Sequence, residues 1–220
     1  LQQKKPVDLV ISTGKQSTVK NFANKVAKKL NISYRDSGAY YRAITLFLIR
    51  NHINSEEIIR NDILEKIDIY QKFENGIFSI FLNDIDVTSN IRGQKVSVNV
   101  SEYAKKPEIR EFVYNLLRKS SESTSIVVDG RDIGTVVFPH AKYKFFLYAI
   151  PEIRAQRRHK EINDESIKIE LIEREIKQRD DIDSTRDIAP LKKAEDAFGI
   201  DVSYLSIDEV FEKIFQKIVM

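Results

Sequence analysis

The sequence predicts an α/β protein, in which a parallel sheet of about five strands is flanked by helices and carries an inserted β-hairpin lobe. Three observations lead to this prediction. The mostly apolar run Val7–Ser12 is typical of a buried parallel strand, and a helical pattern follows it. Ser125–Asp129 and Lys144–Ala149 have the same buried-strand character. Asn75-Gly76 separates two further β-prone runs, which indicates a hairpin.

The first helix is predicted from about Ser17 to Leu30, and Ser17 or Thr18 can cap it. Apolar residues recur there at helical spacing, so that they share one face. These residues are Val19, Phe22, Ala23, Val26, Ala27 and Leu30.

The hairpin is predicted from Tyr70–Phe73 and Ile77–Leu82, which flank the Asn-Gly pair. Asn-Gly favours a tight turn because both turn residues must adopt positive φ. A hairpin inserted between the helices and strands of an α/β chain suggests a small separate lobe within residues 55–100.

The C-terminal part is predicted to be helical over Pro151–Arg179, a charged loop over Asp180–Pro190, and a last strand over Phe198–Asp201. Ser206–Glu209 has the pattern of a capping box, in which the first and last side chains satisfy each other's amides. It opens a final helix whose inward residues are Val210, Phe211, Ile214, Phe215 and Ile218.

The composition is that of a globular protein, with 42% hydrophobic and 31% charged residues over 220 positions. The net charge of +3 gives no reason to expect nucleic-acid binding. The chain has no cysteine, which excludes disulfides and thiolate sites and favours the cytoplasm. No apolar run approaches the roughly 18 residues of a membrane span, and no signal peptide is expected. The histidines show no metal-ligand spacing: His52, His140 and His159.

Several arginines stand in or beside loops with Gly, Ser or Asp, where their planar guanidinium groups could pair with phosphate oxygens. A lone arginine is most often part of a surface ion pair, so the prediction of a phosphate site depends on the whole set. The set is Arg42, Arg110, Arg131, Arg179 and Arg186.

Two motifs within this set resemble a known family. Asp36–Arg42 reads Asp-Ser-Gly-Ala-Tyr-Tyr-Arg, and Gly130–Thr135 reads Gly-Arg-Asp-Ile-Gly-Thr directly after a buried strand. Both resemble the nucleotide-acceptor motifs of bacterial cytidylate kinases, nucleoside monophosphate kinases that phosphorylate CMP and dCMP from ATP. The resemblance extends from about Val7 to Ile218 and implies a P-loop-type fold.

The resemblance implies that Ser37 contacts the pyrimidine and that Arg42 contacts the monophosphate. Val96–Arg110 is similar to the segment that recognises the cytosine and ribose. The resemblance also implies that Asp132 binds the cytosine amino group. A carboxylate suits this role because it accepts from the amine of cytosine and repels the carbonyl of uracil. The implied CMP-binding residues are Ser37, Arg42, Ser101, Arg110, Arg131, Asp132, Arg179, Asp183 and Arg186.

Arg179–Arg186, followed by Ala189-Pro190-Leu191, resembles the lid segment of the family. It implies that Arg179 and Asp183 bind the pentose hydroxyls and that Arg186 lies near the reacting phosphates and the base. The implied organisation is a monomer with a single kinase domain over 1–220. Its parts are a core over about 6–54, 101–150 and 190–220, an NMP-binding insert over about 55–100, and a helical lid over about 151–189.

Ser12–Lys20 occupies the place of the family's phosphate-binding loop, yet it departs from the pattern G-x-x-x-x-G-K-[ST]. An ungapped alignment puts Thr18 at the second glycine and Val19 at the lysine. Lys15 or Lys20 could replace the missing lysine. The predicted ATP-binding residues are Ser12, Thr13, Gly14, Lys15, Gln16, Ser17, Thr18, Val19, Lys20, Arg154, Arg157 and Arg158.

Asp129, at the end of a buried strand, could hold Mg²⁺ through water, and Ser17 or Thr18 could supply a hydroxyl ligand. The implied catalytic residues are Arg131, Arg179, Arg186, Lys15 and Lys20.

Three functions remain open at this point. The first is a cytidylate kinase with Mg²⁺ and ATP as phosphate donor. The second is a protein that binds CMP without phosphoryl transfer, in which Ser12–Lys20 is only a polar loop. The third is a kinase for another monophosphate. The three arginines of the predicted helix at Pro151 could likewise belong to a solvated charged face.

Overall fold

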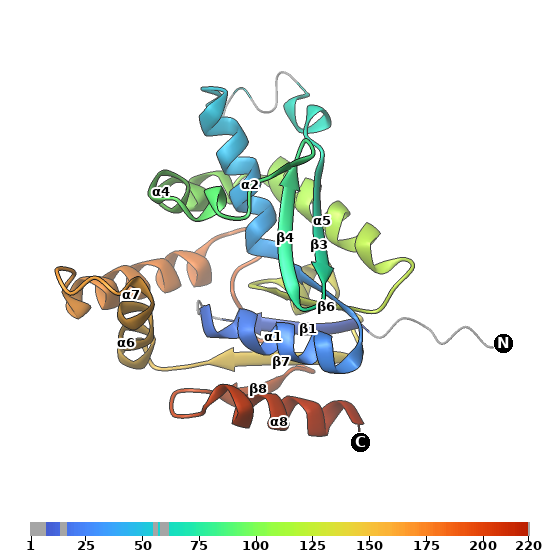
Figure 1. Ribbon diagram of the computed structural model, residues 1–220, viewed down its shortest axis with the longest axis vertical. Helices are drawn as coiled ribbons and strands as arrows, with labels where there is room; N and C mark the ends of the chain where they lie inside the picture. Colours follow the sequence, from blue (N-terminus) through green and yellow to red (C-terminus); the bar gives the residue numbers. More distant parts are fainter. Residues whose placement is uncertain (1–7, 14–16, 55–56, 58–61, 220) are drawn as a thin grey trace.

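A five-stranded parallel sheet forms the centre of the molecule (Figure 1). The computed structural model describes residues 8–13, 17–54, 57 and 62–219. For residues 8–13, 17–21 and 219 it describes the main chain only. The strand order is β2-β6-β1-β7-β8, and every neighbouring pair is parallel, as predicted. The strands are β1 (Asp8–Thr13), β2 (Ser33–Asp36), β6 (Ile126–Gly130), β7 (Tyr143–Tyr148) and β8 (Phe198–Asp201).

Helices cover both faces of this sheet. On one face, α1 (Ser17–Leu30) and α8 (Ile207–Val219) pack in a cluster that includes Val127. On the other face, α2 (Ser37–Arg50) and α5 (Pro107–Ser121) pack in a cluster that includes Ile126 and Val128. Successive side chains of β6 therefore point to opposite faces of the sheet, as expected of a β-strand. This confirms the predicted flanking helices and the predicted bounds of the first helix.

The chain between α2 and α5 contains the predicted hairpin. Asn75 and Gly76 have φ values of 53° and 81°, so the Asn-Gly turn adopts the expected positive angles. The apolar residues Ile69, Ile80 and Leu82 belong to the same cluster as the sheet residues under α2, so the insert shares the central core. Its elements are η1 (Ile63–Lys66), β3 (Ile69–Glu74), β4 (Ile77–Leu82), β5 (Ile85–Asp86), η2 (Asn90–Arg92) and α4 (Gln94–Tyr103).

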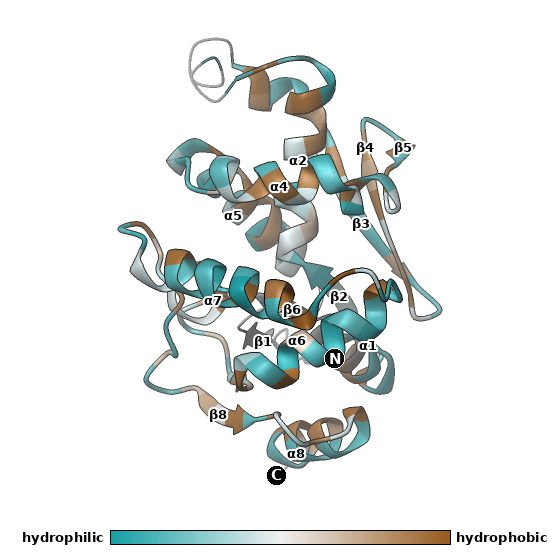
Figure 2. Cartoon of the chain, turned by 90° about the vertical axis from the view of Figure 1, so that its left-hand side faces the viewer, coloured by the Kyte–Doolittle hydropathy of each residue, from teal (hydrophilic) through white to brown (hydrophobic). Residues whose placement is uncertain are grey.

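The predicted lid consists of two helices, α6 (Pro151–Ile162) and α7 (Ile169–Thr185), which lie beside each other at the edge of the molecule (Figure 1). They have a small cluster of their own, formed by Ala155, Ile172 and Ile176. Figure 2 shows hydrophilic and hydrophobic residues alternating along α7, as expected of a helix with one buried side.

The predicted charged loop over Asp180–Pro190 is wrong in its first part, because α7 continues to Thr185. Asp180 pairs with Arg154 of α6, and Asp183 pairs with Arg131 after β6. The two aspartates are three residues apart on a helix and therefore share a face. The charges that suggested a loop are thus partners of buried or half-buried arginines.

The predicted capping box opens α8. The Ser206 amide donates to Glu209 Oε2 at 2.8 Å, and the Glu209 amide donates to Ser206 Oγ at 3.2 Å. Val210, Phe211 and Ile214 are buried beneath the sheet, which confirms the predicted inward face. Between β6 and β7 the chain forms a π-helical turn, η3 (Ile133–Val137). Within the described part of the chain, no helix is both long and apolar enough to cross a membrane.

Candidate active site

The carboxyl ends of β2, β6 and β1 lie at the same edge of the sheet. Asp36 at the end of β2 is level with Asp129 in β6, and Ser12 in β1 is level with Gly130. Ligands of open α/β sheets bind at the carboxyl edge of the strands. Both acceptor motifs therefore begin at the edge where a ligand is expected.

Asp36 fixes the start of α2. Its Oδ1 accepts a hydrogen bond from the Ala39 amide at 3.0 Å, which caps the helix. Gln71 of β3 binds the main chain of the same residue: Asp36 N donates to Gln71 Oε1 at 2.9 Å, and Gln71 Nε2 donates to Asp36 O at 2.7 Å. The buried Ser37, predicted to contact the pyrimidine, is therefore held in the first turn of α2.

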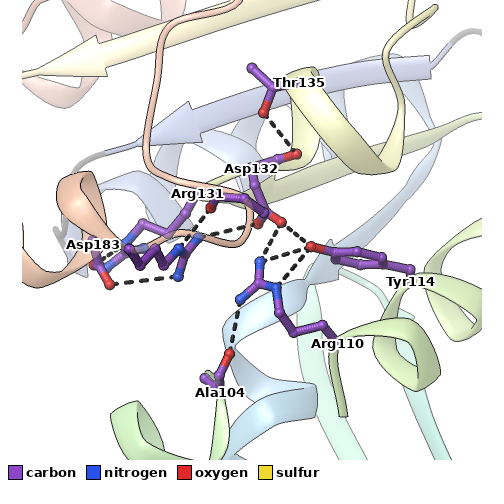
Figure 3. Close-up of polar contacts among 9 residues, drawn as sticks. Ala104, Arg110, Tyr114, Arg131, Asp132, Thr135 and Asp183 are labelled. Carbon is purple, nitrogen blue, oxygen red and sulfur yellow. Dashed lines mark hydrogen bonds and ion pairs between the residues drawn. The ribbon is translucent and has the colours of Figure 1, made fainter. Parts of the chain in front are cut away.

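Arg110, Tyr114 and Asp132 form a buried cluster of polar side chains (Figure 3). Arg110 Nη2 donates to Asp132 Oδ2 at 2.5 Å, and the Tyr114 hydroxyl donates to the same oxygen. Arg110 also donates to the Tyr114 hydroxyl oxygen, from Nε at 3.0 Å and from Nη2 at 2.8 Å. Its Nη1 donates to the carbonyl of Ala104 at 2.9 Å. The charge of Asp132 is thus held within the protein by two partners from α5.

Residues of the lid reach the same place. Arg131 Nε donates to Asp183 Oδ2 at 3.0 Å (Figure 3). Arg186 lies between the two carboxylates, with Nη1 3.8 Å from Asp183 Oδ1 and Nη2 3.9 Å from Asp132 Oδ1. Arg186 Nε donates to the carbonyl of Ala189 at 2.7 Å. The structure therefore brings together two segments that are about 50 residues apart in the sequence. One contains Arg131 and Asp132, and the other contains Asp183 and Arg186.

Arg42 belongs to a concentration of positive charge. Its Nη1 donates to Ser97 Oγ at 3.0 Å. The pKa of Arg42 is lowered, chiefly because burial disfavours its charge. Asp36 opposes this effect, whereas the nearby cations of Arg158 and Arg131 add to it. Such a group of cations is electrostatically suited to a dianionic phosphate.

Arg179 and Arg186 have buried nitrogen atoms without hydrogen bonds among the described residues, Nε in Arg179 and Nη2 in Arg186. The pKa of each guanidinium is lowered, mainly because burial disfavours the charge. Buried donors in folded proteins nearly always have an acceptor. The oxygen atoms of a ligand are one kind of acceptor that could satisfy these nitrogens.

Two tyrosines beside this site are neutral hydrogen-bonding groups at neutral pH. Burial, and then the charge of Asp132, raise the pKa of Tyr114 to about 12. Burial likewise raises the pKa of Tyr41, whose hydroxyl is buried without a hydrogen-bond partner in the described part of the chain. The ring of Tyr41 lies 5.8 Å from the guanidinium carbon of Arg110. The half-buried Ser101 lies one helical turn before Ala104 on the chain.

The predicted phosphate-binding loop falls mainly outside the described residues. The described main chain ends β1 at Thr13 and begins α1 at Ser17, and the side chains from Ser12 to Lys20 are not described. A strand followed by a short connection and a helix is the arrangement that such a loop requires. The roles of Lys15 and Lys20 stay predictions.

The three arginines predicted to approach ATP have different surroundings. Arg154 is buried and pairs with Asp180, with Nη2 and Oδ1 2.9 Å apart. Arg157 Nη2 donates to the carbonyls of Val202 and Ser203, at 2.8 and 2.9 Å. Arg158 is exposed. The structure thus gives Arg154 and Arg157 buried or half-buried protein partners, whereas the exposed Arg158 has an ion pair with Glu161 of the same helix at 3.5 Å.

Asp129 fits the predicted magnesium role by its place and chemistry. It is buried in β6, and its Oδ1 accepts a hydrogen bond from the Tyr34 hydroxyl at 3.0 Å. A carboxylate is the ligand type that Mg²⁺ prefers, and Asp129 adjoins the strand that leads toward α1. Among the described residues, no group of three or more His, Cys, Asp or Glu side chains could hold a metal ion by itself.

Two site residues were not anticipated from the sequence, Tyr114 and Gln71. Tyr114 follows Arg110 by four residues in α5, so both lie on one face of this helix, and a helix prediction there could have paired them. Gln71 had no such signal, because its contact with Asp36 depends on how the insert folds back onto β2.

Comparison with known proteins agrees with this arrangement of motifs. The sequence model of the family described as cytidylate kinase matches residues 7–220. A cytidylate kinase of Fusobacterium nucleatum is 42% identical over 199 residues, which is 89% of this chain and 89% of that protein. A cytidylate kinase of Clostridioides difficile is 44% identical over 201 residues, 89% of this chain and 90% of that protein.

Among solved structures, an uncharacterized protein of Eubacterium ventriosum has a TM-score of 0.53 at 13% identity, and the match covers 98% of both chains. This likeness concerns the fold alone. The match to the family over residues 7–220, together with the identity to its curated members, shows that the chain belongs to the cytidylate kinase family.

Proposed function

We propose that the protein transfers the γ-phosphoryl group of ATP to CMP and dCMP, giving CDP and dCDP. The observation that carries this proposal is that two buried guanidinium nitrogens, Arg179 Nε and Arg186 Nη2, have no hydrogen-bond partner among the described residues. They accompany the buried Arg110–Tyr114–Asp132 cluster. A nucleoside monophosphate has oxygen atoms that the two nitrogens can bind and a base that the cluster can contact. The curated relatives are named as kinases, which favours catalysis over binding alone.

The base and sugar are proposed to lie between α2, α5 and the lid. Asp132 accepts a hydrogen bond from the exocyclic amine of cytosine, because an ionised carboxylate has acceptors only. Ser37, Ser101 and Arg110 complete the contacts to base and ribose. Arg179 and Asp183 bind the pentose hydroxyls, which requires Arg131 to exchange part of its ion pair with Asp183 for the phosphate.

The monophosphate is proposed to bind Arg42, Arg131 and Arg186. In-line transfer then needs no covalent intermediate, since positioning and charge stabilisation account for most of the catalysis in phosphoryl transfer. Lys15 or Lys20 is proposed to bind the transferring phosphoryl group in place of the missing loop lysine, and Arg158 is the lid arginine best placed for ATP.

The proposed Mg²⁺ ion would be held through Asp129, with a hydroxyl of Ser17 or Thr18. When bound, it supplies positive charge that neutralises the β and γ phosphates of ATP. The buried Tyr34 hydroxyl keeps the Asp129 carboxylate in a fixed orientation. We propose that the protein acts on these nucleotides as a monomer.

Phosphoryl transfer from ATP to CMP with Mg²⁺ tests the proposal, measured for the wild type, Lys15→Ala and Lys20→Ala. We expect wild-type turnover and a loss on the order of 10³-fold in kcat for the lysine that binds the phosphates. Lys29→Ala is the matched control, because Lys29 is exposed in the last turn of the same helix.

The absence of wild-type turnover would contradict the proposed kinase. Thermal shift then decides between the alternatives, because a ligand that binds only the native state raises the melting temperature. A shift with CMP but none with ATP would assign the chain to nucleotide binding without transfer. Turnover that survives in both lysine variants would contradict the proposed role of these lysines alone.

A further inference from the structure

The hydroxyl of Tyr114 has a single direction in which it can donate. Two N–H groups of Arg110 point at its oxygen, at 3.0 and 2.8 Å. A phenol oxygen has room to accept these two hydrogen bonds and one proton to donate. Because Arg110 cannot accept a hydrogen bond, that proton is left for Asp132 Oδ2, which is the contact observed.

Asp132 Oδ2 is therefore occupied by two donors, Tyr114 and Arg110. The other carboxylate oxygen, Oδ1, has the Arg186 ion pair at 3.9 Å, a distance beyond that of a hydrogen bond. The carboxylate is thus held by one edge, with Oδ1 toward the lid residues. An edge held by two donors resists rotation, because turning the carboxylate would break both hydrogen bonds.

We infer that Tyr114 is a positioning residue that fixes the Asp132 carboxylate as an acceptor for the exocyclic amine of the base, and so sets the preference for CMP over UMP. The inference rests on the proposed contact between Asp132 and cytosine. A carboxylate that could rotate would offer the base amine no fixed acceptor and would repel the carbonyl of uracil less, since both effects depend on where Oδ1 points. The hydroxyl of Tyr114 opposes this rotation.

Tyr114→Phe tests this role, because it removes the hydroxyl and keeps the ring, which lies 5.7 Å from the guanidinium carbon of Arg118. The measurement is kcat/KM for CMP and for UMP with the full-length protein. We expect the ratio of the two to fall about tenfold, through a higher KM for CMP, with kcat for CMP little changed. A ratio within twofold of the wild type would overturn the inference.

Tyr143→Phe is the matched control. The Tyr143 hydroxyl donates to the carbonyl of Ile218 at 3.1 Å. Tyr143 is the first residue of β7, so it lies at the amino end of the parallel strands, whereas the site lies at their carboxyl ends. We expect this variant to keep the wild-type ratio. A second variant carries 3-fluorotyrosine at position 114, which retains both the ring and a donating hydroxyl. It should keep the ratio as well, whereas a fall equal to that of Tyr114→Phe would attribute the effect to packing and overturn the inference.

Asp132→Asn separates this inference from the proposed function. If Asp132→Asn leaves the CMP to UMP ratio unchanged, Asp132 does not read the base, and both the proposed contact and the role of Tyr114 fail. If Asp132→Asn lowers the ratio and folded Tyr114→Phe does not, the proposed contact stands and the inference about Tyr114 alone is overturned.

Discussion

Gly130, between Asp129 and Arg131, stands where no side chain fits. A Cβ atom added there would lie 2.2 Å from Ser37 Oγ and 2.7 Å from Ile133 Cγ1. Ser37 is buried in the first turn of α2, and Ile133 is buried in η3, so neither can move freely. The glycine of the second acceptor motif is therefore required by the close approach of the first motif.

We expect Gly130→Ala to lower the free energy of unfolding by about 1–3 kcal/mol, since overpacking a filled site costs this much. It should also raise KM for CMP, because Ser37 must shift. Urea unfolding and steady-state kinetics measure the two effects. Gly199→Ala is the control: its Cβ would meet its nearest atoms at 3.7 Å, an ordinary contact. Equal losses in the two variants would contradict the steric explanation.

At the scale of single residues, the sequence predicted candidate residues but not their contacts with one another. Asp132 and Arg110 were predicted to bind the nucleotide, and the structure places both in one buried cluster. That they bind each other directly and share Tyr114 as a partner was not predicted, because these contacts depend on the position of α5 relative to β6. The structure pairs Arg154 with Asp180, and its contact with ATP stays a prediction.

Among the elements, β3 carries a residue that fixes the start of α2. Gln71 binds both the amide and the carbonyl of Asp36, as a neighbouring strand would do. The end of β2 is thus joined to the insert by a side chain, since β3 belongs to a separate sheet. The insert therefore supports the acceptor motif from outside the central sheet.

We expect Gln71→Ala to lower the free energy of unfolding by about 1–3 kcal/mol, because it leaves two buried main-chain groups of Asp36 without these partners. KM for CMP should rise while kcat changes less, because the effect reaches the substrate through Ser37. Chemical denaturation and initial-rate kinetics provide the readouts. Lys72→Ala, at the next position of β3 and exposed, should leave both unchanged. A normal KM in Gln71→Ala would show that β3 does not position the acceptor motif.

The elements themselves followed local patterns closely. The Asn-Gly turn, the capping box and the apolar periodicity of α1 each contain their signal within a few residues, and all three predictions are confirmed. The end of α7 did not follow its local pattern. Asp180 and Asp183 have loop-like composition, but ion pairs with Arg154 and Arg131 hold them in helical positions.

Buried tyrosines affect the whole molecule at alkaline pH. Burial raises the pKa values of Tyr34, Tyr41, Tyr40 and Tyr114, the last two to about 12. The native state keeps these protons above pH 10, whereas the unfolded chain loses them near its ordinary value of 10. The stability from these groups is therefore fully present below about pH 10 and is lost as pH rises toward 12.

We expect the free energy of unfolding, measured by urea denaturation, to fall steadily between about pH 10 and pH 12. Tyr40→Phe should make this fall shallower by about 1.4 kcal/mol per pH unit, the value for one proton. Tyr204→Phe, at an exposed position, is the control and should leave the slope unchanged. The same slope in wild type and Tyr40→Phe would contradict the linkage.

The sequence by itself determined the parallel α/β fold, the family and the candidate residues of the acceptor site. These features depend on periodicity, turn chemistry and short motifs, which are local in the chain. Only the tertiary structure decided which of those residues bind each other. Tyr114 and Arg186 contact Asp132, which is 18 and 54 residues away in sequence, and Gln71 contacts Asp36, which is 35 residues away. Such pairings depend on how α5, β3 and the lid pack against the sheet, which no local pattern contains.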